Sequence, residues 1–163
     1  MLQKNSGITA LELVTTIAIV AVIAALVMPP YLKWNRAHRL GGAATNLTAD
    51  LEMAKMRAIR ENAFVVVEFG AGNYTIFVDN GEGGGSAADW NHNGAEIVAQ
   101  NRDLPPGVQI DTGSLNFPTI SDKTRFNGRG LPPDIVAPRG IQLANATNSR
   151  LITVNRLGYI NVQ

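Results

Sequence analysis

The sequence predicts an α+β protein in which one long N-terminal helix packs on a C-terminal antiparallel β domain. Three observations indicate this fold: a charge-poor apolar run, a stripe of apolar residues at helical spacing, and short segments separated by glycine and proline. Charged residues make up only 17% of the 163 residues, and there is no cysteine. These values exclude a disulfide-stapled miniprotein and a cysteine-ligated zinc site.

The apolar run covers residues 8–28 and contains one ionisable side chain, Glu12. Twenty-one helical residues span about 31 Å, close to the hydrocarbon thickness of a bilayer. We therefore expect residues 8–30 to form a transmembrane helix. Proline lacks an N–H group and clashes with the preceding helical turn, so we expect the helix to kink or loosen at Pro29 and Pro30.

The flanking charges leave the orientation of this helix open. Lys4 precedes it and weakly favours a cytoplasmic N-terminus, whereas Lys33, Arg36 and Arg39 follow it and favour the opposite orientation. Glu12 lies at the edge of the run, where a carboxylate either stays solvated at the headgroup level or pairs with a cation from another subunit.

Residues 31–62 are predicted to continue the helix as an amphipathic second half. Apolar side chains recur here every three or four residues, which places them on one face of a helix that should pack on a sheet. The members of this stripe are Leu40, Ala44, Leu47, Leu51, Ala54 and Ala58.

Residues 63–163 are predicted to form the antiparallel β domain. Residues 64–69 and 74–78 are typical of a hairpin, with a glycine-containing turn at 70–73. Frequent glycine and proline then indicate short strands in one antiparallel sheet or in two small sheets. The further strands are expected at residues 96–100, 108–111, 124–127, 140–144, 150–154 and 159–162.

The acidic, glycine-rich segment 79–96 is a candidate calcium site. Its pattern Asp-x-Asn-x-Asn-Gly at residues 89–94 spaces oxygen ligands like the first half of an EF-hand loop, although Gln100 replaces the bidentate glutamate. A flexible turn rich in Asp and Asn explains the same residues without a metal. No other cofactor is expected. The predicted ligands are Asp79, Asp89, Asn91, Asn93 and Glu96.

The sequence does not indicate an enzyme. It contains no visible nucleophile–base pair, and the glycine run 83–85 is not followed by the lysine of a phosphate-binding loop. Charge is segregated along the chain: residues 33–60 carry +4, residues 61–101 carry −6 and residues 102–163 carry +3. This segregation favours either electrostatic complementarity between subunits or neutralisation within one subunit.

Residues 7–13, GITALEL, resemble the type IV prepilin signal, whose usual string is GFTLIEL. Gly7, Thr9, Glu12 and Leu13 match this string, and Ile8 replaces the usual phenylalanine. The resemblance implies that residues 1–7 are a leader peptide, which a prepilin peptidase removes between Gly7 and Ile8 on the cytoplasmic side. It also implies N-methylation of Ile8 and pairing of Glu12 with the N-terminal amine of a neighbouring subunit.

The rest of the chain resembles the H-type minor pseudopilins of type II secretion and the FimT-type minor pilins. The resemblance rests on a Phe-x-x-x-Gly turn at residues 126–130 and a final hairpin with Gly158 in its turn. It implies a structural subunit of a type II secretion pseudopilus or a type IV pilus. The implied protein crosses the bacterial inner membrane once, with its C-terminal domain in the periplasm, and is extracted into a periplasmic or extracellular filament.

The implied partners are other pilin or pseudopilin subunits, prepilin peptidase, the inner-membrane assembly platform and membrane lipid. A major pilin, or a DNA- or ligand-binding minor pilin at a pilus tip in competence or adhesion, is the alternative. Arg156 is the single basic residue after position 150, and the net charge is +1, so nucleic-acid binding is not expected.

Overall fold

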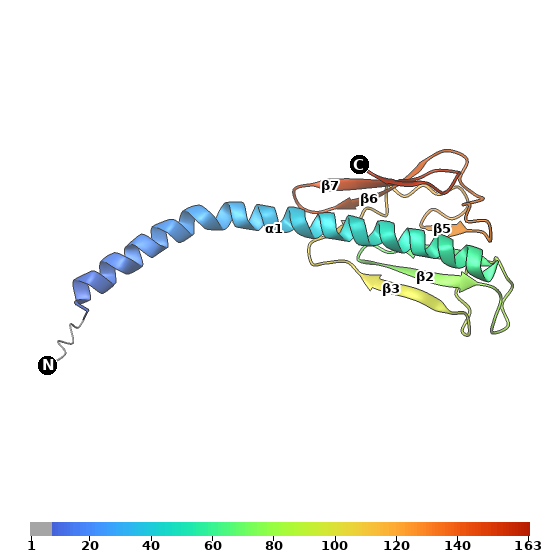
Figure 1. Cartoon of the computed structure of the whole chain (residues 1–163), viewed down its shortest axis with the longest axis horizontal. Helices are drawn as coiled ribbons and strands as arrows, with labels where there is room; N and C mark the ends of the chain where they lie inside the picture. Colours follow the sequence, from blue (N-terminus) through green and yellow to red (C-terminus); the bar gives the residue numbers. More distant parts are fainter. Residues whose placement is uncertain (1–7) are drawn as a thin grey trace. The chain divides into compact units, whose positions relative to one another are not determined.

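The computed structural model describes residues 8–163, and the predicted leader, with Gly7 at its end, lies outside the described residues. The chain divides into two compact units, residues 1–35 and 36–163. Helix α1, Ala10–Glu61, contributes residues to both units, and the strands β1 to β8 follow it (Figure 1).

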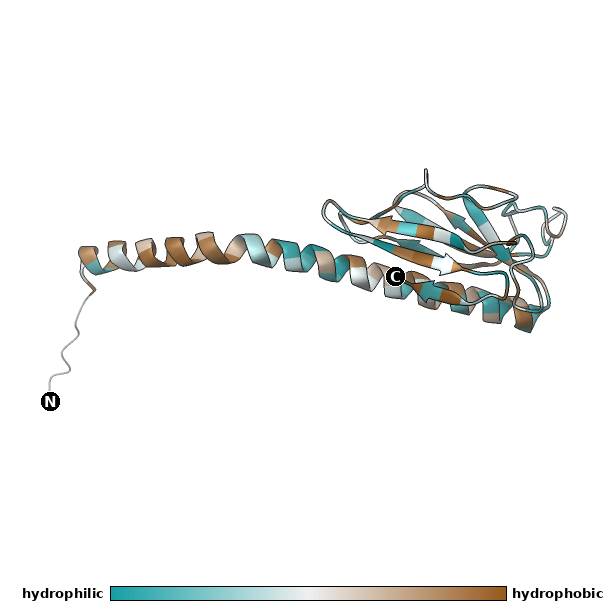
Figure 2. Ribbon diagram, turned by 90° about the horizontal axis from the view of Figure 1, so that it is seen from above, coloured by the Kyte–Doolittle hydropathy of each residue, from teal (hydrophilic) through white to brown (hydrophobic). Residues whose placement is uncertain are grey.

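The first unit contains the apolar half of α1. An 18-residue window in this helix has a mean hydropathy of 2.5 and no buried residue, so it is long and apolar enough to cross a membrane. Figure 2 shows the hydrophobic colour gathered over the N-terminal turns of α1. The helix continues through Pro29 and Pro30. Neither proline can donate a hydrogen bond to the preceding turn, and the expected loosening there stays a prediction.

The second unit is built around the amphipathic half of α1. All six apolar residues of the predicted stripe are buried in one core cluster together with side chains of the β strands. The helix ends at Glu61, and Asn62 adopts a left-handed backbone conformation with φ of 49°, as is common just past a helix C-terminus. The predicted fold, a long helix packed on an antiparallel β domain, is therefore confirmed.

The β domain consists of two antiparallel four-stranded sheets, the second of the two arrangements that the sequence left open. The first sheet has the strand order β3-β2-β1-β5, and the second has the order β4-β6-β7-β8. The first sheet comprises β1 Phe64–Phe69, β2 Asn73–Asp79, β3 Val98–Asp103 and β5 Lys123–Phe126. The second comprises β4 Gln109–Ile110, β6 Arg139–Ala144, β7 Ser149–Val154 and β8 Ile160–Val162.

Strand β3 differs most from its sequence-based prediction, which placed it at residues 96–100. It begins two residues later and runs to Asp103, pairing with β2 across an irregularity between Ile76 and Phe77. The difference has a physical cause at both ends. Glu96 is recruited by the preceding loop, and Arg102 is held in the strand by a partner on the helix.

A buried polar network joins α1 to the first sheet. Asp50 interrupts the apolar stripe and is only 8% exposed. Its Oδ2 accepts hydrogen bonds from the Tyr74 hydroxyl at 2.6 Å and from Arg102 Nε at 2.7 Å. Arg102 Nη2 donates to Oδ1 at 3.3 Å. The Asp50 side chain thus makes an ion pair and a further hydrogen bond, which offset the penalty of burying it and join the helix to β2 and β3.

Replacing Tyr74 by Phe is expected to flatten the loss of stability at alkaline pH. Burial, followed by the hydrogen bond to Asp50, raises the pKa of Tyr74 above its ordinary value of 10. The folded phenol therefore keeps its proton to higher pH than the unfolded one. Its contribution to stability is fully present below about pH 10 and is lost as the pH rises further.

Thermal unfolding of the full chain in detergent micelles, measured on both sides of this pH, tests the prediction. The melting temperature of the wild type should fall more steeply above about pH 10 than that of Tyr74→Phe. Tyr159→Phe is the matched control, because Tyr159 is 68% exposed and should leave the wild-type slope unchanged. A wild-type slope in Tyr74→Phe would contradict the assignment.

Candidate functional site

The first turn of α1 contains Glu12, the predicted assembly charge. Thr9 caps the helix: its Oγ1 accepts a hydrogen bond from the backbone N–H of Glu12 at 3.2 Å. Ile8, where cleavage would expose a new amine, lies two residues before the helix begins and four residues before Glu12 in the sequence. Within residues 8–163, Glu12 forms no ion pair. Its carboxylate is available to a group outside this part of the chain.

The turns after Glu12 present apolar side chains outward on all sides of the helix. The two hydroxyls among them are satisfied locally, because Thr15 Oγ1 donates to the Glu12 carbonyl at 3.0 Å and Thr16 Oγ1 to the Leu13 carbonyl at 2.8 Å. The surface therefore offers no free donor and suits a lipid or protein environment. Its large exposed members include Leu13, Val14, Ile17, Ile19, Val20, Val22, Ile23, Leu26 and Val27.

The acidic loop, which we define as residues 80–97 between β2 and β3, is held by Asp79 at its start. This carboxylate is 1% exposed. Its Oδ1 accepts the backbone N–H groups of Ala88 at 2.7 Å and Asp89 at 3.3 Å. Its Oδ2 accepts the N–H of Trp90 at 3.0 Å. Ala88 and Trp90 have φ of 66° and 70°, and these unusual conformations turn their N–H groups toward Asp79.

Glu96 holds the other end of the acidic loop. It is 4% exposed, and its two carboxylate oxygens accept the N–H groups of Gly81 and Asn93, each at 2.9 Å. In the middle of the loop, Asp89 Oδ1 accepts a hydrogen bond from the backbone N–H of Asn91 at 2.8 Å, and Asp89 Oδ2 accepts one from Asn93 Nδ2 at 3.2 Å. These bonds hold the pKa of Asp89 below its ordinary value. Hydrogen bonds to the carboxylates of Asp79, Asp89 and Glu96 therefore hold the acidic loop in an ordered conformation.

Trp90 anchors the acidic loop to the first sheet, a contact that the sequence analysis missed. Its side chain packs on Val66 and Phe77 in a second, smaller apolar cluster. The Arg125 guanidinium lies 4.0 Å from the Trp90 ring centroid and 4.4 Å from that of Phe64, so one cation is held between two aromatic rings. A large aromatic residue inside a glycine-rich acidic stretch was the one signal that could have predicted this anchor.

The five predicted calcium ligands all lie in or next to the acidic loop, but their carboxylates already accept N–H groups. Among residues 8–163, no group of three or more His, Cys, Asp or Glu side chains is arranged to hold a metal ion. A bound calcium ion would have to replace the hydrogen bonds that Asp79 and Glu96 make in this structure. Calcium binding at the loop stays a prediction.

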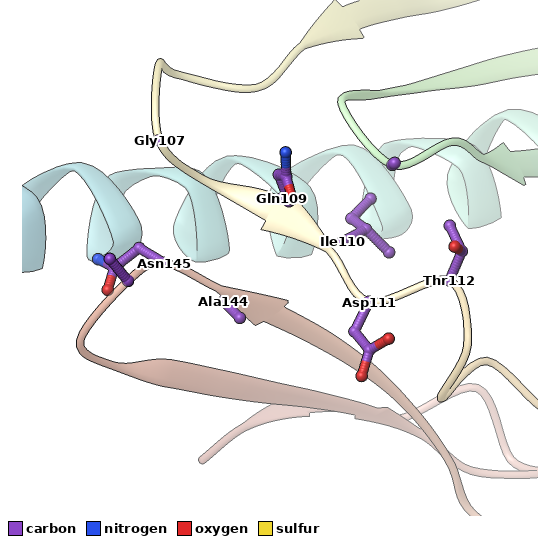
Figure 3. A pocket seen from close by; sticks show the side chains of 9 residues that line it. Gly107, Gln109, Ile110, Asp111, Thr112, Ala144 and Asn145 are labelled. Carbon is purple, nitrogen blue, oxygen red and sulfur yellow. The ribbon is translucent and has the colours of Figure 1, made fainter.

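A hollow of about 620 Å³ lies beside β4, where Figure 3 shows the side chains that line it. The single ionisable side chain among the nine lining residues is Asp111, whose Oδ1 accepts the N–H of Gly113 at 3.2 Å. This lining supplies no pair of a nucleophile and a histidine base, which a hydrolytic site would need.

Comparison with known proteins agrees with this arrangement. The family described as type II transport protein GspH matches residues 43–158 of the chain. The pilin-like protein PilA1 of Thermus thermophilus is 29% identical over 157 residues, which cover 93% of this chain and 88% of that protein.

Two solved structures share the fold. The type IV minor pilin FimU of Pseudomonas aeruginosa has a TM-score of 0.56 at 14% identity, covering 80% of this chain and 92% of that chain. The minor pseudopilin EpsH of the type 2 secretion system of Vibrio cholerae has a TM-score of 0.54 at 13% identity, covering 77% of this chain and 96% of that chain. At such low identity they support the pilin-like fold alone.

Replacing Asp79 by Ala is expected to destabilise the β domain by about 2–4 kcal/mol, because three backbone N–H groups lose a charged acceptor. Urea unfolding of the full chain in micelles, followed by tryptophan fluorescence, measures the change. Glu82→Ala is the matched control: Glu82 is an exposed acid of the same loop and should change stability by less than about 0.5 kcal/mol. Equal effects of the two variants on stability would contradict the claim that Asp79 holds the acidic loop.

Proposed function

Because the chain belongs to the GspH family of type II transport proteins, we propose that residues 8–30 hold it in the bacterial inner membrane until it is drawn into a filament. The chain is a structural subunit of a pilus or pseudopilus. The membrane and filament stages are supported by the apolar half of α1, which no part of the described chain covers. Burying one large apolar side chain contributes about 1.5–3 kcal/mol, so water is the least favourable surrounding for this segment.

We further propose that processing makes the subunit ready for assembly. Cleavage between Gly7 and Ile8 by prepilin peptidase, followed by N-methylation of Ile8, leaves a charged amine at the start of the helix. The same cut removes Lys4, the single charge of the leader. Transfer of the apolar helix from lipid into a bundle of neighbouring helices then needs few charged groups to be desolvated.

Glu12 supplies the partner for that amine in this proposal. A carboxylate among packed apolar helices is unfavourable when it is alone, and a cation from the next subunit offsets this penalty. Glu12 forms no ion pair within residues 8–163 and is exposed in the first turn of α1, so an amine from a neighbouring chain can reach it. The pair would set the axial register of adjacent subunits.

The β domain would remain in the periplasm or on the filament surface and contact other subunits there, with the inner-membrane assembly platform acting during extraction. No specific observation favours a DNA- or ligand-binding tip protein, or a major pilin, over this proposal. Residues 61–101 carry six acidic and no basic side chains, which disfavours contact with nucleic-acid phosphates over that segment.

Replacing Glu12 by Gln is expected to leave membrane insertion intact and to reduce incorporation into filaments by about tenfold or more, because the neighbour's amine loses its partner. Immunoblots of membrane and sheared-filament fractions from cells that express the full chain measure both quantities. Glu82→Gln, an exposed acid of the acidic loop, is the matched control. Wild-type incorporation of Glu12→Gln would rule out the pairing.

A further inference from the structure

Three basic residues follow the apolar half of α1 on the side that the proposed function places outside the cytoplasm. Residues 13–32 carry no charge, and Lys33, Arg36 and Arg39 come next. The first carboxylate after Glu12 is Asp50. The positive-inside rule predicts such cations on the cytoplasmic side of a membrane helix. These three cations therefore oppose the orientation in the proposed function, and a role other than setting the orientation must explain them.

Two of these cations line a cleft of about 240 Å³ in the second unit. Arg39 Nη1 donates to the Pro106 carbonyl at 3.4 Å, and Asn145 Nδ2 donates to the Arg36 carbonyl at 3.0 Å. These bonds tie the helix to the β3–β4 turn and the β6–β7 turn, whose residues Gly107 and Asn145 are labelled beside α1 in Figure 3. We call this space the arginine cleft; its lining residues are Arg36, Arg39, Pro106, Gly107, Val108, Asn145 and Ala146.

The arginine cleft carries uncompensated positive charge. Within residues 8–163 neither Arg36 nor Arg39 forms an ion pair, whereas Arg57, Arg102 and Arg125 each have a carboxylate partner. None of the seven lining residues is acidic. Two exposed arginines, three residues apart on the helix, therefore keep most of their N–H donors for solvent or a ligand. Guanidinium donors suit an anion with several oxygens, such as a phosphate.

The position of the cleft along α1 matches the headgroup layer of a bilayer. A helix rises 1.5 Å per residue, so Arg36 follows the uncharged stretch by about 6 Å, and headgroups occupy about 5–8 Å on each side of the hydrocarbon. The aromatic residues Tyr31, near the end of the stretch, and Trp34, just before Arg36, have ring centroids 6.2 Å apart. Such aromatic residues are typical of membrane interfaces.

We propose that the arginine cleft binds the phosphate of an anionic phospholipid in the leaflet that faces the β domain. This proposal rests on the proposed membrane-anchored stage. Arg36 and Arg39 donate hydrogen bonds to the phosphate oxygens, and Asn145, which bonds the Arg36 carbonyl, holds the β6–β7 turn against the helix beside them. The bound headgroup holds the β domain at the membrane surface, and extraction into a filament must break this contact.

Native mass spectrometry of the full chain in detergent, with phosphatidylglycerol and phosphatidylcholine added in equal amounts, tests the proposal. We expect the wild type to retain phosphatidylglycerol in preference to phosphatidylcholine by about tenfold. The double variant Arg36→Gln/Arg39→Gln should lose the preference. The matched control, Arg129→Gln/Arg156→Gln, removes two exposed arginines from turns elsewhere in the β domain and should keep it.

Wild-type retention of phosphatidylglycerol by the Arg36→Gln/Arg39→Gln variant would overturn the proposal. So would complete displacement of the lipid by millimolar inorganic phosphate, which would make the cleft a site for free phosphate. If this variant keeps its lipid but its subunits cross-link more weakly, the arginines pair with carboxylates of a neighbouring chain. That result would also overturn the proposal. Equal melting temperatures of the variants and the wild type confirm that the β domain is folded.

Carbonate extraction of membranes, measured in parallel, keeps this proposal separate from the proposed function. A chain that resists extraction but shows no preference for phosphatidylglycerol overturns the lipid site alone. A chain that is released by carbonate overturns the membrane-anchored stage and the lipid site with it.

Discussion

A continuous helix whose first half is apolar on every side is the constraint from which the rest of this protein's behaviour follows. The hydrophobic effect drives such a surface out of water, yet no part of the described chain covers it. The covering must come from other molecules. In the proposed function, a bilayer provides it for a single subunit and packed helices provide it in a filament, so the same segment would serve both as a membrane anchor and as an assembly element.

The second half of α1 meets the same physical demand within the chain. Its buried stripe packs on both sheets, and Asp50 adds a charged hydrogen-bonding contact to Tyr74 and Arg102. The helix that anchors the subunit is therefore also the central element of the β domain. This core would transmit a pull on the helix to the domain, which the proposed extraction from the membrane requires.

Local patterns were sufficient for much of the fold. The helical stripe and most strands follow from periodicity and from glycine and proline positions, because these depend on neighbours along the chain. Contacts between distant residues were not predictable. The sequence around Asp50 does not identify its partners, because Tyr74 and Arg102 reach it only when β2 and β3 pack on the helix. In the same way, the sequence of the acidic loop does not reveal that Asp79 accepts hydrogen bonds from the backbone N–H groups of residues nine and more positions away.

Labelling of single cysteines with a water-soluble maleimide tests the central constraint most directly, because the chain has no cysteine of its own. Val20 in the apolar half of α1 and Val136 in the β domain are 64% and 76% exposed in the isolated chain. If lipid and then neighbouring helices cover the apolar half, Val20→Cys is protected both in membranes and in sheared filaments, while Val136→Cys reacts in permeabilised membranes. Labelling of Val20→Cys as fast as Val136→Cys in both preparations would contradict the account.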